Sequence, residues 1–220
     1  CYLPIEFFFT DSMTMALPLI ALTHHDIDIE VKFADKGYTK DNFTSEVVSA
    51  ELVYDMIYLD TDLRKKIATS DYQFVIQQTQ HISDSISGTS FKTPLYFKHP
   101  VAMLLWRVEQ DSNVFGIIEK AKLSANGIDI CEEFHGNYFR YVQNYQSVNS
   151  KEIALLGYYM YSFAKSPLSA QPSGSLNFSR LDNVILSGAT VEPAGGTLHV
   201  FAQNLNIFIV KDGMAGLMWR

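Results

Sequence analysis

The chain has 220 residues, 47% of them hydrophobic, so it can bury one good core or two small ones. Its 24 acidic and 17 basic residues give a net charge of −7, which argues against a basic surface for binding nucleic acid. The two cysteines, Cys1 and Cys131, are too few for a disulfide framework and suit a reducing compartment.

The N-terminal part of the chain contains one clear strand pattern. Its longest apolar run, residues 13–22, is interrupted by Thr14 and Pro18 and is far below the ~20 residues that a membrane helix needs. Apolar and charged side chains then alternate over residues 27–33, which predicts a half-buried strand with one wet face. No initiator Met or signal-peptide pattern is present, so we expect the chain to be a fragment of a longer protein.

One segment, residues 60–70, predicts a helix. Asp60 or Thr61 can cap it, and Leu63 and Ile67 fall one helical turn apart. The segment also carries the most basic run of the chain, Arg64, Lys65 and Lys66.

The remaining chain predicts strands separated by turns. Residues 157–163 are aromatic and extended in character, and residues 198–202 and 205–210 form two further strand patterns with a bulge between them. Asn126-Gly127 is the strongest short hairpin signal. Small and polar residues predict loops at 83–89, 166–175 and 188–196. Strands without alternating helices favour a two-sheet sandwich or a jelly roll.

The most informative run lies between Gln171 and Asp182 and has the sequence Gln-Pro-Ser-Gly-Ser-Leu-Asn-Phe-Ser-Arg-Leu-Asp. Pro172 presets its own φ, Gly174 permits a tight reversal, and residues 177–180 are predicted to begin a strand. No nucleophile elbow, phosphate loop or metal-ligand spacing accompanies the run. It resembles a signature of the major capsid proteins of nucleocytoplasmic large DNA viruses, the double jelly-roll group that includes chlorella viruses and iridoviruses.

Further segments along the chain are similar to the same family. They are Leu3-Pro4 with Phe7-Phe8-Phe9, residues 16–22, Tyr58-Leu59-Asp60-Thr61, Asn126-Gly127, residues 136–139 with Val142-Gln143, residues 161–164 and residues 213–217. Departures from the family pattern are Asn144 in place of Pro, Ala215 in place of Gly and His24 in place of Tyr. These departures affect only local geometry, because the family has no catalytic group to lose.

The resemblance implies an all-β fold, the viral double jelly roll, with a nearly complete C-terminal jelly roll and the last strands of the N-terminal one. Residues 1–62 would be the C-terminal part of the first jelly roll, residues 63–71 a short helical linker, and residues 72–220 the second jelly roll. The N-terminal strands of the first jelly roll would then be missing.

The function implied by the resemblance is structural: a major capsid protein that forms trimeric, pseudo-hexagonal capsomers of an icosahedral shell. Expected partners are two further copies, neighbouring capsomers and minor capsid proteins, with no specific nucleic acid and no transmembrane segment. The expected location is the virion, with assembly in the cytoplasm of the host cell. The resemblance implies no enzyme activity and no catalytic, cofactor-binding or metal-binding residue.

A carbohydrate-binding, lectin-like jelly roll is the alternative, since that fold also serves lectins. Tyr158, Tyr159, Tyr161 and Phe163 are candidates for a sugar-stacking surface, although aromatic residues in strands more often pack in the core. A jelly-roll enzyme is a second alternative, for which the sequence offers no adequate group of residues.

Two clusters of reactive residue types are candidate sites. His24-His25 precedes Asp26 and Asp28, but adjacent strand residues point to opposite faces and cannot readily chelate one ion. Cys131 stands beside Glu132 and Glu133, with His135 nearby, and is interpreted as part of a polar loop. Flanking carboxylates raise the pKa of a thiol, which disfavours a nucleophile. Asn42-Phe43-Thr44 and Asn177-Phe178-Ser179 match the glycosylation sequon, which we interpret as coincidence.

Overall fold

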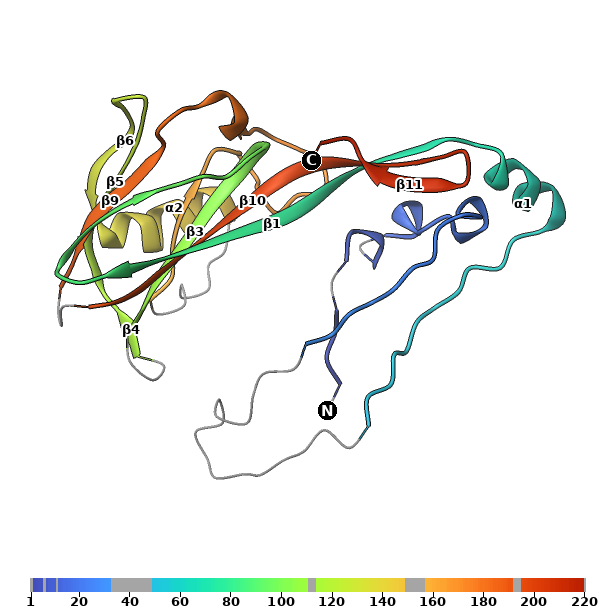
Figure 1. Ribbon diagram of the computed structural model, residues 1–220, viewed down its shortest axis with the longest axis horizontal. Coiled ribbons are helices and arrows are strands. Elements are labelled where there is room, and N and C mark those ends of the chain that lie inside the picture. Colours follow the sequence, from blue (N-terminus) through green and yellow to red (C-terminus); the bar gives the residue numbers. More distant parts are fainter. Residues whose placement is uncertain are drawn as a thin grey trace.

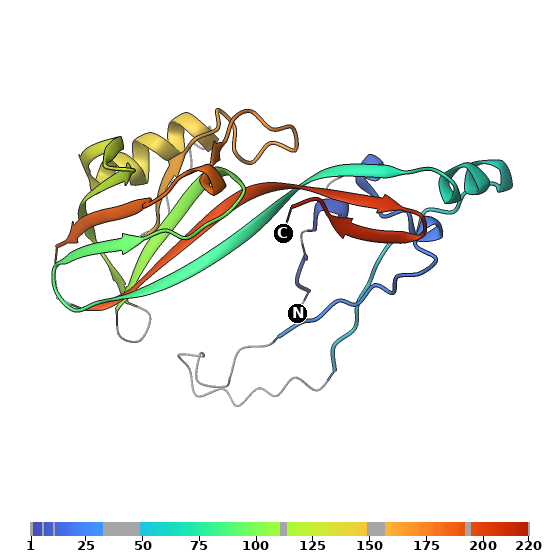
Figure 2. The ribbon, with the colours of Figure 1, turned by 45° about the horizontal axis from the view of Figure 1, so that its top comes forward.

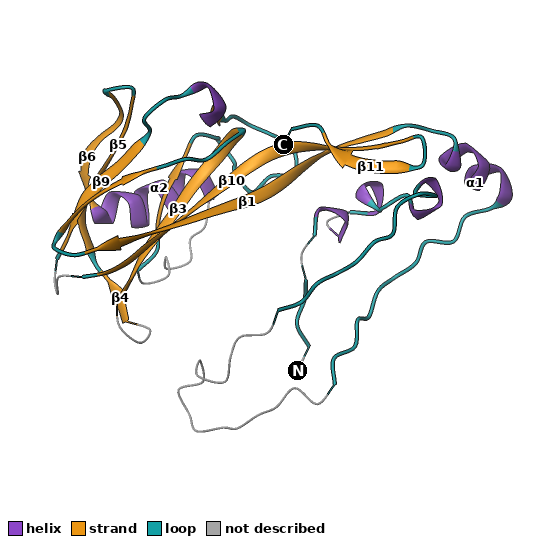
Figure 3. Cartoon of the chain, in the orientation of Figure 1, coloured by secondary structure: helices purple, strands orange, loops and turns teal. Residues whose placement is uncertain are grey.

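The computed structural model describes residues 2–5, 7–10, 12–32, 49–110, 114–148, 157–191 and 195–219. The molecule is elongated, with a two-sheet sandwich at one end and a narrow β-ribbon that projects from it toward the other (Figures 1 and 2). Strands dominate the sandwich and the ribbon, whereas the N-terminal residues form turns and loops beside the ribbon (Figure 3).

Two sheets form the sandwich. The larger one contains β1 (Tyr72–Ile86), β10 (Gly196–Lys211), β3 (Pro100–Gln110), β4 (Val114–Gly116), β7 (Tyr159–Ser162), β8 (Leu176–Asn177) and β11 (Met214–Leu217). The smaller one contains β2 (Ser90–Pro94), β9 (Ile185–Thr190), β5 (Ile118–Ala125) and β6 (Ile128–His135). The start of β1, the end of β10 and β11 make up the projecting ribbon.

The strand pairing is nested along the chain. The antiparallel pairs β1 with β10, β2 with β9, β3 with β7, and β5 with β6 run from the outermost strands of the sandwich to the innermost hairpin. Four nested pairs folded over into two sheets are the eight-stranded jelly roll. The predicted all-β jelly-roll fold is therefore confirmed.

The core lies between the sheets and follows strand alternation. In β3, Leu104, Trp106 and Val108 are fully buried, while the residues between them face outward. Trp106 packs edge-on against Phe139 at a centroid distance of 5.2 Å. Because each large apolar side chain contributes about 1.5–3 kcal/mol when it is buried, this stripe is a main source of sandwich stability.

Two turn-level predictions are confirmed. Asn126 and Gly127 form the tip of the β5–β6 hairpin with φ values of 52° and 79°, the left-handed pair that a two-residue turn requires. The predicted irregularity at Gln203 and Asn204 is present as a register shift, although the two patterns that flank it form one continuous strand, β10.

The predicted helix is also present, as α1 (Thr61–Ala68). Asp60 caps it, because its Oδ1 accepts a hydrogen bond of 2.9 Å from the Leu63 N–H. No residue of α1 is buried. A second helical stretch was not predicted: a π-helix (Tyr138–Val142) continues into α2 (Gln143–Val148). This stretch packs on the core through Phe139, which is 1% exposed. The shortest helical turns are 3-10 helices at Phe8–Thr10, Met13–Met15, Leu19–Ala21 and Phe178–Arg180.

The strand predicted at residues 27–33 is wrong for the part that the structure describes. Residues 27–32 belong to no strand, and Phe33 lies outside the described residues. Ile27, Ile29 and Val31 are 38–48% exposed. Alternation alone does not make a strand, which needs a neighbour to bond; the described residues before α1 contain no strand.

Two of the three predicted loops are shorter than expected. Residues 83–86 extend β1, because they pair with the first residues of β10, and residues 188–190 complete β9. Residues 192–194 of the third predicted loop lie outside the described part of the chain. Residues 166–175 contain neither helix nor strand, as predicted. Ladder pairing thus overrides the local preference of Ser and Gly for turns.

The N-terminal residues pack against the ribbon. Phe8 contacts the rings of Phe74 and Phe208 at centroid distances of 6.3 and 5.3 Å. Ala21 and Leu22 form a small buried cluster with Val210, separate from the main core. The N-terminal segment is therefore held to the ribbon by few apolar contacts, without a sheet of its own in the described residues.

Candidate functional site

The Gln171–Asp182 run lies against the beginning of β3. Its two-residue strand β8 pairs Asn177 with Pro100, and the chain then turns into the 3-10 helix. The Asn177 side chain makes this turn, because its Oδ1 accepts a 3.0 Å hydrogen bond from the Ser179 N–H. The predicted strand at residues 177–180 is wrong beyond its first residue for this reason. The Asn177 side chain of the second glycosylation sequon is thus engaged in this turn. The first sequon, residues 42–44, lies outside the described residues.

Close packing explains the other residues of the run. Phe178 is 2% exposed and contacts Phe97 and Phe163. Gly174 has a φ of 151°, and a Cβ atom there would lie 2.8 Å from the Phe163 carbonyl oxygen. The run therefore has a structural role: it holds the chain against the beginning of β3 by strand pairing, a side-chain turn and aromatic packing.

Cys131 lies within strand β6, not in the predicted polar loop. It is buried and free, and its pKa is raised to about 11, first by burial and second by the nearby charge of Glu132. Glu133 forms an ion pair with Lys120 at 2.9 Å, and His135 Nδ1 accepts a hydrogen bond from the Asn137 N–H. The cluster is thus divided among separate partners and does not activate the thiol.

The two adjacent histidines do not converge. His25 Nδ1 accepts a hydrogen bond of 3.0 Å from the Ala215 N–H, whereas His24 is held by its backbone N–H, which donates to the Gly213 carbonyl. Within the part of the chain that the structure describes, no three His, Cys, Asp or Glu side chains are grouped to hold a metal ion.

The aromatic row at residues 158–163 is divided between two faces. Tyr159 is buried, and its hydroxyl oxygen accepts a hydrogen bond of 2.9 Å from the Ile118 N–H. Tyr161 and Phe163 pack against the same core, which confirms the packing interpretation for these three residues. Tyr158 instead faces the outside of the larger sheet, so the row offers no continuous surface for stacking a sugar.

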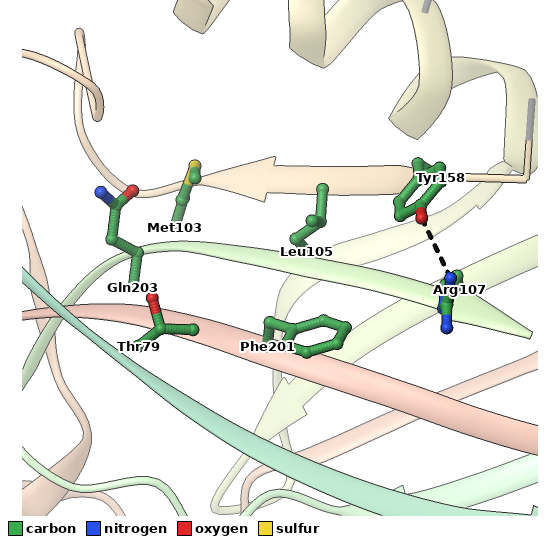
Figure 4. Close-up of a pocket in the computed structure, with 7 residues that line it drawn as sticks. All are labelled: Thr79, Met103, Leu105, Arg107, Tyr158, Phe201 and Gln203. Carbon is green, nitrogen blue, oxygen red and sulfur yellow. Dashed lines mark hydrogen bonds between the residues drawn. The ribbon is translucent and has the colours of Figure 1, made fainter. Parts of the chain in front are cut away.

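An amphipathic groove of about 420 Å³ lies on that outer face (Figure 4). Its lining residues come from three adjacent strands and the residue before β7: Thr79, Met103, Leu105, Arg107, Tyr158, Phe201 and Gln203. Arg107 closes one end, because it donates a 3.0 Å hydrogen bond to the Tyr158 hydroxyl and its guanidinium lies 5.5 Å from the Phe115 ring centroid. Glu109 neutralises it through an ion pair of 2.8 Å.

Sequence reasoning did not find this groove. The available signal was the alternation in β3, where Met103, Leu105 and Arg107 occupy the positions between buried residues. That alternation predicts that these three side chains share one face of β3, but it does not predict which residues of β1 and β10 lie beside them. None of the helices in the described ranges is long and apolar enough to cross a membrane.

Comparison with known proteins gave consistent matches along the chain. A family model described as "Large eukaryotic DNA virus major capsid protein" matches residues 64–216, and one described as "Major capsid protein N-terminus" matches residues 1–61. The major capsid protein of Pyramimonas orientalis virus is 33% identical, with 99% of this chain and 61% of the relative covered. That of Paramecium bursaria Chlorella virus 1 is 27% identical, with 99% and 66% covered. The chain therefore spans less than two thirds of the length of these relatives.

A solved structure matches over the whole chain. A chain of the quasi-atomic model of the PBCV-1 virus capsid superposes with a TM-score of 0.78 at 25% sequence identity, with 100% of this chain and 70% of that chain covered. The likeness thus includes the N-terminal residues as well as the sandwich.

Proposed function

The chain belongs to the family of large eukaryotic DNA virus major capsid proteins, and we propose that it is a structural protein of a viral capsid. The observation that carries this proposal is the superposition of the whole chain on a chain of the PBCV-1 capsid. The nested jelly roll gives the role a physical basis, because two sheets packed over one core make a stiff unit that can be tiled. The lectin-like alternative is not favoured by these relatives, which are named capsid proteins.

We further propose that the chain is divided into the end of a first jelly roll at residues 1–62, a helical linker at 63–71 and a second jelly roll at 72–220. Support comes from the sandwich, whose first strand begins at Tyr72. The absence of buried side chains in α1 fits a linker that packs weakly on either side.

The proposed assembly is a trimer that forms a pseudo-hexagonal capsomer of an icosahedral shell. The trimer would contact neighbouring capsomers and minor capsid proteins in the virion, after assembly in the host cytoplasm. Open strand edges support an assembling role: β1, β2 and β6 each lie at the edge of a sheet in the described fold. Such edges are usually covered in a stable protein, and neighbouring subunits are one way to cover them.

The test is the mass and shape of the purified chain in solution. Native mass spectrometry should show three copies of the 24.9 kDa chain, and negative-stain electron microscopy should show three-fold particles with one sandwich per chain. A glycan array provides the comparison with the lectin-like alternative. A stable monomer that binds a sugar on the array would contradict the capsid proposal and support the alternative.

A further inference from the structure

Two histidine rings are stacked on the outer face of the larger sheet, beside the groove. His81 comes from the edge strand β1 and His199 from β10, and their ring centroids lie 5.3 Å apart with planes inclined by 14°. His81 Nε2 and His199 Nδ1 form a hydrogen bond of 3.0 Å. His81 also stacks on Phe201, a lining residue of the groove, at 4.5 Å.

This hydrogen bond limits the number of protons that the pair can hold. One of the two bonded nitrogens must lack a proton in order to accept. His199 Nε2 lies 3.4 Å from the Glu109 carboxylate, an arrangement in which Nε2 carries the proton and Nδ1 accepts from His81. His81 can then gain a proton on its other nitrogen without loss of the bond. A further proton can only enter at His199 Nδ1, where it breaks the bond and leaves two stacked cations.

The surroundings of His199 disfavour this last proton. The charged and titratable groups that face it are His81 from β1, Arg107 and Glu109 from β3, and Tyr158 on the far side of Arg107. Its pKa is lowered, first by burial and then by the Arg107 charge, while Glu109 acts in the opposite direction and His81 adds to the lowering. Glu109 is already bonded to Arg107, so its charge compensates only in part.

We propose that the His81–His199 pair is an acid-sensitive fastener that ties edge strand β1 to β10 across the outer face of the larger sheet. The fastener is closed while the pair holds at most one extra proton, and it opens when the second arrives. Because His81 stacks on Phe201, opening also changes the wall of the groove. This property adds a pH response to the proposed capsid role and does not depend on that role.

The sign of the effect follows from linkage. A free histidine has a pKa near 6.5, and the folded pair resists its second proton, so the unfolded chain binds more protons just below that pH. The stability that the pair contributes is therefore fully present above about pH 6.5 and is lost as the pH falls below it. The unfolding constant should rise about tenfold for each unit by which the second protonation lies below 6.5.

The first experiment measures urea unfolding of the full chain between pH 7.5 and 5.0, in EDTA so that a metal bridging the two rings does not contribute. His81→Gln keeps a donor for His199 Nδ1 but removes one charge, so its unfolding constant should rise less than that of the wild type over this range, by about tenfold for each unit by which the second protonation lies below 6.5. His24→Gln is the matched control and should keep the wild-type pH dependence. A His81→Gln variant with the wild-type pH dependence would overturn the proposal.

The second experiment requires no variant to fold. An NMR titration of the wild-type imidazole protons should show the pair taking up its protons in two separate steps, with the second step below pH 6.5. Titration of both rings together in a single step near pH 6.5 would show that the rings are not coupled, and would also overturn the proposal.

Discussion

The backbone N–H of His99 donates a hydrogen bond of 2.8 Å to Oγ of Ser179, a residue 80 positions later in the chain. His99 has a φ of 68°, an uncommon conformation for a residue other than glycine, and its carbonyl oxygen accepts from the Phe178 N–H at 3.1 Å. The two bonds fix the entry to β3 against the run that carries the family signature. That run is therefore better explained by folding than by chemistry.

Ser179→Ala should lower the free energy of unfolding by about 1 kcal/mol, because the His99 N–H loses its acceptor while His99 keeps its strained φ. Urea denaturation measures the change. Ser175→Ala, at an exposed position in the same run, is the control and should cost less than about 0.5 kcal/mol. Equal stability of the two variants would show that the hydrogen bond from the His99 N–H to Ser179 contributes nothing to stability.

Gly188→Ala should be strongly destabilising. A Cβ atom at Gly188 would lie 2.3 Å from the Lys120 carbonyl oxygen and 2.7 Å from the Phe91 ring, so the neighbouring strand β5 would have to move. We expect a loss of about 1–3 kcal/mol in thermal or urea unfolding. Gly216→Ala tests the explanation, because a Cβ atom at Gly216 would meet no other atom within 4 Å and the change should be nearly neutral.

Tyr159→Phe should destabilise the sandwich by about 1–3 kcal/mol, because the Ile118 N–H would be left buried without an acceptor. The pKa of Tyr159 is raised, chiefly by burial, so the folded protein resists its ionisation. The stability that the neutral Tyr159 hydroxyl contributes is fully present below about pH 10 and is lost as the pH rises above it. Unfolding at pH 8 and at pH 10.5 should therefore differ less for Tyr159→Phe than for the wild type. Tyr145→Phe, at a site 61% exposed, should retain the wild-type difference.

Local chemistry predicted the features that depend on a few neighbouring residues. The Asp60 cap, the Asn126-Gly127 turn and the irregularity at Gln203 all follow from short-range preferences, and all are present. The absence of a strand at residues 27–32 was not predictable from the alternation, because a strand also needs a partner strand elsewhere in the chain. The His81–His199 pair could not be predicted from the sequence either. The two residues are 118 positions apart, and only the register of β1 and β10 brings them together.

Cys131 should react slowly with iodoacetamide in the folded protein. With a pKa of about 11, it holds about a hundredfold less thiolate at neutral pH than a thiol of pKa 9, and burial restricts access further. Site-resolved mass spectrometry separates its labelling from that of Cys1. The rate should rise with pH and should reach that of a free thiol in urea. Rapid labelling of folded Cys131 at mildly acidic pH would contradict the burial argument.

Limited trypsin digestion should cut in α1, at Arg64, Lys65 or Lys66. Trypsin needs an extended substrate, and α1 can unfold locally at little cost because none of its residues is buried. Digestion should leave a resistant piece that begins near Ile67.

The two sides of this cut should differ in their resistance to trypsin. Lys92, Lys120 and Lys122 provide an internal control, since they lie in paired strands of the sandwich and should survive much longer. Among the described residues, the N-terminal part is held by the small cluster of Ala21, Leu22 and Val210, the Phe8 contacts and two hydrogen bonds between residues 24–25 and the ribbon, so it should be degraded once it is released. Gel electrophoresis with N-terminal sequencing measures both events. Survival of residues 1–62 for as long as residues 72–220 would contradict this prediction, because the N-terminal part would then be folded stably and not weakly held.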